Sequence, residues 1–452
     1  MKHSRKMTLL VLFVVVIVAV SWLPLRPRGP MDFATGTRVD LTAYRGSDPT
    51  GARLGIGEAD LVARGEYLAR AADCIGCHTA PGGKPFAGGL DFKLPFGILY
   101  STNITPDKQT GIGEWTDDEF VKAMHEGMGK NGQLLYPVFP YTAYSLLTRE
   151  DVLAIKAYLF SLQPVSKTSP KTDLSFPFNQ RYLMFFWTVL YNPGQRFQPN
   201  IDQTPEWNRG AYLVEALGHC GECHTPRTLS QALDAGKKFG GATVEGWKAY
   251  NITSDSQSGI GAWSDAELAD YLARGHADGR STAAGPMGLV LNKSLRFLAR
   301  DDIRAMVAYL RSVPPIRDQA DLAVAHKPPS SFPVAPTLTA QEPLDDDDGL
   351  GRRVFEGACA SCHQWDGSGV QSPYAALTGN RTANDPEAVN LTQVILHGAS
   401  LESEQGEIFM PAFGKGYSDA EIAAVMNYVT GRFGVKASTI TPNEVAKRRE
   451  EH

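Results

Sequence analysis

The sequence predicts an all-α protein made of three tandem helical domains that follow an N-terminal membrane anchor helix. Three observations lead to this prediction: a cysteine-containing pentapeptide that occurs three times, a repeat that aligns two long stretches of the chain, and one apolar run near the N-terminus. At 452 residues the chain is too long for one compact core, and its 43% hydrophobic and 21% charged residues are typical of a globular protein. The net charge of −5 gives no basic excess that would attract nucleic acid.

Residues 1–30 are predicted to be a membrane anchor or a signal segment. The apolar run at 8–23 is about as long as a short transmembrane helix, and it is also near the upper length of a signal-peptide core. No small-residue cleavage site follows it, so we favour a single uncleaved anchor. The run is preceded by the basic residues Lys2, Arg5 and Lys6. These charges keep that end cytoplasmic, which places the remaining chain on the periplasmic side of the cytoplasmic membrane.

Every cysteine of the chain belongs to a C-x-x-C-H motif. The three motifs are Cys74 and Cys77 with His78, Cys220 and Cys223 with His224, and Cys359 and Cys362 with His363. A disulfide framework would need cysteines far apart, a thioredoxin-type motif would not repeat three times with histidine, and a zinc site would need a second cysteine pair. The spacing instead predicts three covalently bound haem c groups, each held by two thioethers, with the following histidine as proximal iron ligand.

The first two motifs lie in a long internal repeat. Asn103-Ile-Thr recurs at Asn251 and Gly111-Ile-Gly recurs at Gly259, both at an offset of 148 residues (103 + 148 = 251; 111 + 148 = 259). The third copy is shorter and lacks these blocks. We therefore expect domains at 50–195, 200–316 and 345–436, called the first, second and third unit below. Asn103 and Asn251 either hydrogen-bond to haem propionates or cap their own loops.

Each unit is expected to end in an amphipathic helix with a tyrosine in its third turn. These helices are expected at 152–162, 303–313 and 422–433, where apolar residues recur at helical period. Thr148 and Ser418 precede two of them with a carboxylate three residues later, which is the spacing of a helix N-cap. The same spacing at Thr116 and Ser264 predicts a middle helix in the first and second units.

Two segments lie outside the predicted units. Residues 317–344 are rich in proline and lack apolar periodicity, so they are expected to form an extended linker. Residues 437–452 are expected to be a polar tail.

The sixth ligand of each haem iron indicates whether the site transfers electrons or binds substrate. A methionine sulfur completes the coordination and raises the reduction potential. Met410 lies on a loop before the closing helix of the third unit, and Met287 occupies the equivalent loop of the second unit. We expect both methionines to be axial ligands.

The first unit departs from this pattern. Adding 148 to Phe139 gives 287, so phenylalanine, which cannot bind iron, occupies the position of Met287. Met184 is the first choice for the axial ligand, because the apolar stretch at 176–191 should pack on the unit. His125 and Met128 are the other candidates, and an open iron is the remaining alternative.

The chain resembles the three-haem cytochrome c subunit of the membrane-bound periplasmic dehydrogenases of acetic acid bacteria and related proteobacteria. The resemblance covers residues 50–435 and rests on blocks beyond the haem motif. They are Arg-Gly-Glu-Tyr-Leu at 64–68, Ser-Thr-Asn-Ile-Thr-Pro at 101–106, Gly-Ile-Gly-Glu-Trp at 111–115, Leu-Tyr-Pro at 135–137, Phe-Pro-Phe-Asn at 176–179 and Gly-Pro-Met at 285–287. It implies class I cytochrome c-like domains.

The resemblance also implies partners. Family members accept electrons from a catalytic subunit that contains flavin, PQQ or molybdopterin and oxidises alcohols, gluconate, fructose or aldehydes. They pass these electrons to ubiquinone or to a terminal cytochrome or oxidase. On this basis the chain is expected to be the non-catalytic cytochrome subunit of a dehydrogenase complex.

A second function, from a different class, is a multihaem enzyme such as a peroxidase or a thiosulfate dehydrogenase. Its motivation is Phe139, since an iron without a sixth ligand could bind substrate. The sequence contains no dinucleotide-binding fingerprint and no nucleophile motif, so no catalytic residue is assigned.

Overall fold

The computed structural model describes residues 29–52, 60–318, 346–369, 372–404 and 406–450. The predicted anchor, except for its last two residues, and nearly all of the predicted linker lie outside these ranges. Among the described helices, none combines the length and the apolar character needed to cross a bilayer.

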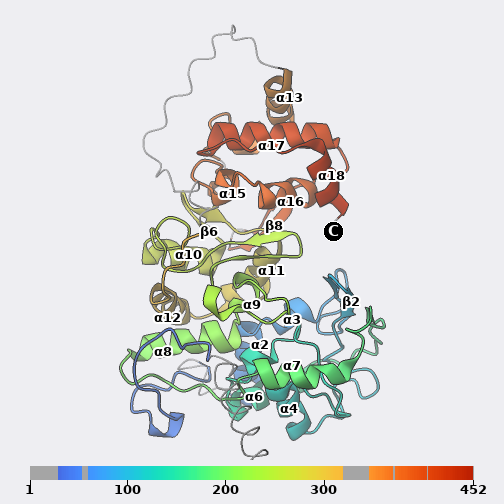
Figure 1. The fold of residues 1–452 in the computed structure, drawn as a ribbon, viewed down its shortest axis with the longest axis vertical. Helices are drawn as coiled ribbons and strands as arrows, with labels where there is room; N and C mark the ends of the chain where they lie inside the picture. Colours follow the sequence, from blue (N-terminus) through green and yellow to red (C-terminus); the bar gives the residue numbers. More distant parts are fainter. Residues whose placement is uncertain (1–28, 53–59, 319–345, 370–371, 405, 451–452) are drawn as a thin grey trace, which may run out of the picture.

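The second unit contacts both of the others. Figure 1 shows the second unit in the middle of the molecule, between the first unit at the lower end and the third unit at the upper end. The first two units meet through their entry and closing helices. The second and third meet through polar contacts such as Asn292, which donates to the Ser400 carbonyl (3.1 Å) and accepts from the Glu402 amide (2.8 Å).

The first unit combines helices with one small sheet, and the short η2 (Leu41–Ala43) precedes it. Its elements are α2 (Leu61–Ala71), α3 (Cys74–Cys77), β1 (Asp91–Leu94), β2 (Gly97–Tyr100), α4 (Asp117–Glu126), α5 (Tyr141–Tyr144), α6 (Arg149–Ser161), β3 (Asp173–Leu174), η3 (Arg181–Leu183) and α7 (Met184–Tyr191).

The second unit repeats this order with a π-helical turn, η4, before its cysteine motif. Its elements are α8 (Pro205–Ala211), η4 (Tyr212–Leu217), α9 (Gly221–His224), η5 (Ala235–Lys237), β4 (Ala242–Val244), β5 (Trp247–Ala249), α10 (Asp265–Arg274), β6 (His276–Ala277), β7 (Ser281–Thr282), α11 (Gly285–Lys293), η6 (Leu295–Phe297) and α12 (Arg300–Arg311).

The third unit also has a π-helical turn, η8, at its cysteine motif. Its elements are α13 (Asp346–Val354), η8 (Phe355–Cys359), α14 (Ala360–His363), η9 (Pro373–Ala375), α15 (Arg381–Asn384), α16 (Val389–His397), β8 (Ala399–Ser403), β9 (Gly406–Met410), α17 (Asp419–Phe433) and α18 (Pro442–Glu450).

The expectation of an all-α fold is correct for the framework and wrong for the connecting segments. These segments form four small antiparallel sheets, ordered β1-β2-β3, β4-β5, β6-β7 and β8-β9 in the described ranges. Their strands are only two to five residues long. Alternation of apolar and polar residues needs a longer stretch to be recognised, so the sequence pattern did not reveal them.

In all three units a glycine of the entry helix lets the closing helix cross at close range. A Cβ atom built on Gly65, Gly210 or Gly351 would lie 1.8, 1.9 or 2.2 Å from a backbone carbonyl oxygen of the closing helix. The helix pairs are α2 with α6, α8 with α12, and α13 with α17. Only a residue without a side chain fits such a crossing, so these glycines set the geometry that surrounds each cysteine motif.

The predicted helix caps are confirmed. Thr116, Ser264 and Ser418 form capping boxes with the glutamate three residues on, and Thr148 accepts a hydrogen bond from the Asp151 amide. Residues 437–452, expected to be a polar tail, contain the packed helix α18. Its Val445 is fully buried, and Arg449 pairs with Asp419 of α17 at 2.8 Å.

The first two units exchange a reciprocal pair of tyrosine–aspartate hydrogen bonds. Tyr67 of α2 donates to Asp302 of α12 (2.5 Å), and Tyr212 of η4 donates to Asp151 of α6 (2.5 Å). The two tyrosines are equivalent in the repeat at an offset of 145 residues (67 + 145 = 212), and the two aspartates at an offset of 151 (151 + 151 = 302). The interface therefore has approximate twofold symmetry.

Candidate functional site

Each cysteine motif lies at the end of an entry helix and forms about one helical turn. In α3, Cys74 and Cys77 are three residues apart, a spacing that places two side chains on the same side of a helix. All six cysteines of the chain are free of disulfide bonds. Burial raises the pKa of Cys74 and Cys77 to about 12, so both thiols are neutral in the folded chain.

The three motif histidines are held in the same way. The Nδ1 atoms of His78, His224 and His363 lie 2.7, 2.6 and 2.6 Å from the backbone carbonyl oxygens of Thr102, Tyr250 and Ala375. Burial lowers the pKa of each of these histidines, which favours the neutral ring. A neutral ring whose Nδ1–H donates to a carbonyl keeps the lone pair of Nε2 for a metal ion.

Asn103 and Asn251 hold the loops that supply two of these carbonyl groups. Asn103 accepts from the Thr105 amide (2.9 Å) and donates to the Val165 carbonyl (2.7 Å). Asn251 accepts from the Thr253 amide (2.8 Å) and donates to the Ile316 carbonyl (2.6 Å). Both ends of each amide are used within the protein, so the loop-capping interpretation is confirmed.

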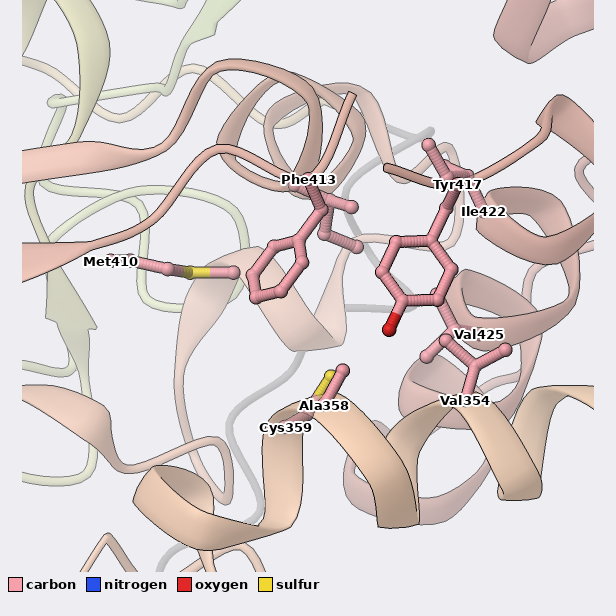
Figure 2. A pocket seen from close by; sticks show the side chains of 9 residues that line it. Val354, Ala358, Cys359, Met410, Phe413, Tyr417, Ile422 and Val425 are labelled. Carbon is pink, nitrogen blue, oxygen red and sulfur yellow. The ribbon is translucent and has the colours of Figure 1, made fainter. Parts of the chain in front are cut away.

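The third unit contains an apolar pocket beside its cysteine motif. Figure 2 shows Met410, Phe413 and Tyr417 across the pocket from Cys359. The pocket is lined by Val354, Ala358, Cys359, Ile395, Met410, Phe413, Tyr417, Ile422 and Val425. None of these side chains is charged. The lining contains Cys359, which can attach a haem, and the thioether of Met410. His363 of the same motif has its Nδ1 hydrogen-bonded to a carbonyl. These residues fit a covalently bound haem.

Met287 and Met410 lie at different kinds of position. Met410 is the last residue of β9, and Met287 is the third residue of α11, whereas the sequence suggested a loop for both. Both side chains are half-buried and pack against the hydrophobic core of their unit.

The segment that contains Met184 lies against the first-unit loop that carries Phe139. Arg181, three residues before it, donates to the Leu134 carbonyl (2.9 Å). Trp187, three residues after it, packs edge-on against Tyr141 with ring centroids 6.0 Å apart. Met184 is half-buried at the start of α7. The segment that contains it therefore covers the loop at 134–141.

The two other candidates lie near the same loop. Met128 forms an isolated β-bridge with Leu134. His125 is 4% exposed, and its buried Nε2 atom has no hydrogen-bond partner. Burial lowers the pKa of His125 to about 4, so its ring is neutral. Met128 thus lies beside this loop, and His125 lies on α4, which packs against the helix α5 that follows the loop.

Tyr144 connects the surroundings of the first two motifs, although no sequence motif marks it. Its hydroxyl donates to the Ala72 carbonyl (3.0 Å), two residues before Cys74. Its ring packs edge-on against His219, which precedes Cys220, with ring centroids 5.6 Å apart, and lies 5.5 Å from the ring of Phe139. The sequence could not predict this role of Tyr144, because the contact joins residues of two different units and no local pattern reveals it.

Comparisons with known proteins agree with this geometry. A family model described as cytochrome c matches residues 62–163 and 350–432. The chain is 39% identical to the gluconate 2-dehydrogenase cytochrome c subunit of Pantoea cypripedii, over 86% of this chain and 90% of that protein. It is 40% identical to the fructose dehydrogenase cytochrome subunit of Gluconobacter japonicus, over 86% and 82%. It is 36% identical to the cytochrome c subunit of a quinone-type alcohol dehydrogenase of Gluconacetobacter polyoxogenes, over 87% and 85%.

Proposed function

This chain belongs to the cytochrome c subunits of membrane-bound dehydrogenases, and we propose that it relays electrons from a dehydrogenase catalytic subunit to a separate acceptor. One observation carries the proposal: three times in the chain a half-buried histidine directly follows two free cysteines, and its Nδ1 is hydrogen-bonded to a backbone carbonyl. Covalently bound haem c supplies a one-electron iron couple in such a site. The protein's own residues attach it, orient its proximal ligand and exclude water.

Three haem c groups per chain are part of the proposal. The attaching residues are Cys74, Cys77, Cys220, Cys223, Cys359 and Cys362, and the proximal ligands are His78, His224 and His363. The proposed axial ligands are Met287 in the second unit, Met410 in the third and Met184 in the first. The contacts of Arg181 and Trp187 around the loop at 134–141 support Met184.

The proposed donor is a catalytic subunit containing flavin, PQQ or molybdopterin, and the proposed acceptor is ubiquinone or a terminal cytochrome or oxidase. We place the protein on the periplasmic side of the cytoplasmic membrane, held by residues 1–30 as a single anchor. The names of the relatives support a dehydrogenase partner. They also support the relay over the alternative of a peroxidase-like or thiosulfate dehydrogenase-like enzyme.

The donor is tested by mixing the reduced catalytic subunit that copurifies from solubilised membranes with the oxidised protein. Haem absorption should report reduction on mixing. Turnover of peroxide or thiosulfate by the isolated protein, together with ready binding of carbon monoxide at one haem, would contradict a pure relay.

The axial ligands are tested by replacing methionine with leucine, which has a similar volume but no sulfur. Met287→Leu is expected to lower the midpoint potential of one haem, because the thioether raises it. The matched control is Met306→Leu, since Met306 is a buried core methionine of the same unit (1% exposed). Met184→Leu should change a different haem, and three unchanged haem spectra would remove Met184 as a ligand.

A further inference from the structure

Helix α7 and the short η3 before it present a stripe of three aromatic residues and one valine to solvent, called the α7 stripe below. The stripe consists of Tyr182, Phe185, Phe186 and Val189, which are 65, 57, 60 and 45% exposed. Their spacing of three, one and three residues places them on one face of a helix. Phe176 (79% exposed) precedes the stripe on the same segment.

The opposite face of α7 is fixed to the protein. Thr188 is hydrogen-bonded to the hydroxyl of Tyr141 in the first unit (3.0 Å). Trp187 donates to the Ser230 carbonyl (2.9 Å), and the Tyr191 hydroxyl is hydrogen-bonded to the Ser230 hydroxyl (2.8 Å) in the second unit. Because both units hold the helix, the stripe is exposed by the fold itself and not by fraying of a loose segment.

The segment around the stripe is uncharged and strongly apolar. Between Arg181 and Arg196 the chain contains no charged residue. A surface helix of a soluble protein normally turns polar residues to solvent, whereas α7 has apolar residues on both faces. A contiguous exposed apolar patch marks a contact with a membrane or with another protein, and helices at the membrane surface bury Trp, Phe and Leu side chains between the lipid headgroups and acyl chains.

The point where the described chain begins indicates what the stripe contacts. The described chain begins at Gly29, where an added Cβ would lie 3.1 Å from the side-chain nitrogen of Gln195. Gln195 is four residues after the end of α7. Gly29 is followed by the buried Met31 (3% exposed), and the Pro30 carbonyl accepts a hydrogen bond from Lys238. The described chain therefore begins next to Gln195, four residues beyond the end of α7, and the apolar run at 8–23 precedes this point in the sequence.

We propose that the α7 stripe is a second membrane contact, which inserts its aromatic side chains into the bilayer surface next to the N-terminal segment. This proposal rests on the proposed membrane location. Two contacts fix the orientation of a protein on a membrane, whereas one anchor leaves it free to tilt. The stripe would therefore set which side of the first two units faces the bilayer.

The test uses the full-length haem-loaded protein in vesicles of phosphatidylethanolamine and phosphatidylglycerol. A nitroxide label is attached to Phe186→Cys, and to Val435→Cys in the third unit as a control of similar exposure (42%). Electron paramagnetic resonance then measures collisions of each label with oxygen, which is concentrated in lipid, and with a water-soluble nickel chelate. We expect nickel collisions at position 186 to fall severalfold below those at 435, and oxygen collisions to rise. Unfolding curves check that both variants fold like the parent.

Two results would overturn the proposal. One is equal access of nickel to both labels in vesicles. The other is protection of position 186 that appears only when the dehydrogenase subunit is added to the vesicles, which would assign the stripe to a protein partner. Haem reduction by that subunit is measured on the same samples, so a failure of the relay is seen separately. The mass of the membrane-bound protein is also measured. If residues 1–30 are missing and the label at position 186 is still protected, the proposed anchor is wrong and the proposed membrane contact of the stripe stands.

Discussion

The first and second units each contain a buried tyrosine that donates a hydrogen bond to an aspartate in the closing helix of the other unit. Only one of the two aspartates forms an ion pair with an arginine in the structure. Asp302 is paired with Arg209 through two contacts, at 2.9 and 2.7 Å. Asp151 instead accepts from the Gly51 amide (2.9 Å), and burial raises its pKa. The repeat has therefore kept the hydrogen bond and changed how the charge is compensated.

A second difference lies directly before the cysteine motifs. Asp73 and His219 precede Cys74 and Cys220, and both have positive φ angles, 47° and 35°. Burial raises the pKa of Asp73 to about 8 and lowers the pKa of His219. The two units thus share backbone geometry and differ in the titratable side chain directly before the cysteine motif, an acid in the first unit and a base in the second.

The largest effect is expected from Arg209→Met. This change leaves Asp302 buried without its cation, which typically costs about 3–5 kcal/mol. The equivalent residue of the first unit is Arg64, whose buried Nε has no hydrogen-bond partner. Arg64→Met should therefore cost less, about 1 kcal/mol. Urea unfolding of both variants measures the difference, and equal losses would show that the two units are electrostatically equivalent after all.

The shared scaffold is tested by Gly65→Ala and Gly210→Ala. Each added methyl group would meet the carbonyl oxygen of Ala154 or Ala305 at less than 2 Å, so both helix crossings must open. Overpacking of this kind costs roughly 1–3 kcal/mol, and we expect similar losses in both units. Gly357→Ala is the control, since an added Cβ there meets nothing within 4 Å. A loss confined to one unit would contradict a common crossing geometry.

Asp73→Asn tests the charge beside the first motif. The raised pKa of Asp73 means that its contribution to stability is fully present below the unfolded value near 4 and is lost as pH rises towards about 8. In that window the free energy of unfolding should fall as pH rises, because the unfolded chain releases the proton that the folded chain retains. Asp73→Asn should remove this slope, whereas the exposed control Asp118→Asn (77% exposed) should keep it. Unfolding curves between pH 4 and 8 decide.

The smallest effect is expected from Tyr144→Phe. The ring stays against His219, but the hydrogen bond to the Ala72 carbonyl is lost, which costs about 1 kcal/mol. At the offset of the closing helices the second unit has Leu295 at this position (144 + 151 = 295), so the contact is specific to the first unit. Tyr182→Phe, on an exposed side chain, is the control and should change stability by less than about 0.5 kcal/mol. Equal melting curves for both variants would show that the hydroxyl of Tyr144 adds nothing.

The local features of this protein could be predicted from its sequence, and the contacts between units could not. The caps at Thr116, Ser264 and Ser418 and the closing helices follow from spacings within one element. Tyr67 and Asp302 are 235 residues apart, and no pattern in a single sequence joins them. The apolar stretch around Met184 was expected to pack on the first unit. One face of α7 does so, but periodicity alone could not show that the other face is exposed.

The reciprocal tyrosine–aspartate pairs also bear on how the protein is made. At a synthesis rate of ~5–20 residues per second, the ribosome needs roughly 10–50 s to reach Asp302 after Tyr67 has been added. During that interval the first cysteine motif is complete, but the surface that will bury Tyr67 does not yet exist. Synthesis of the first motif and closure of the interface are therefore separated in time. A haem attached early would reach its final, water-excluded surroundings only when the second unit folds against the first.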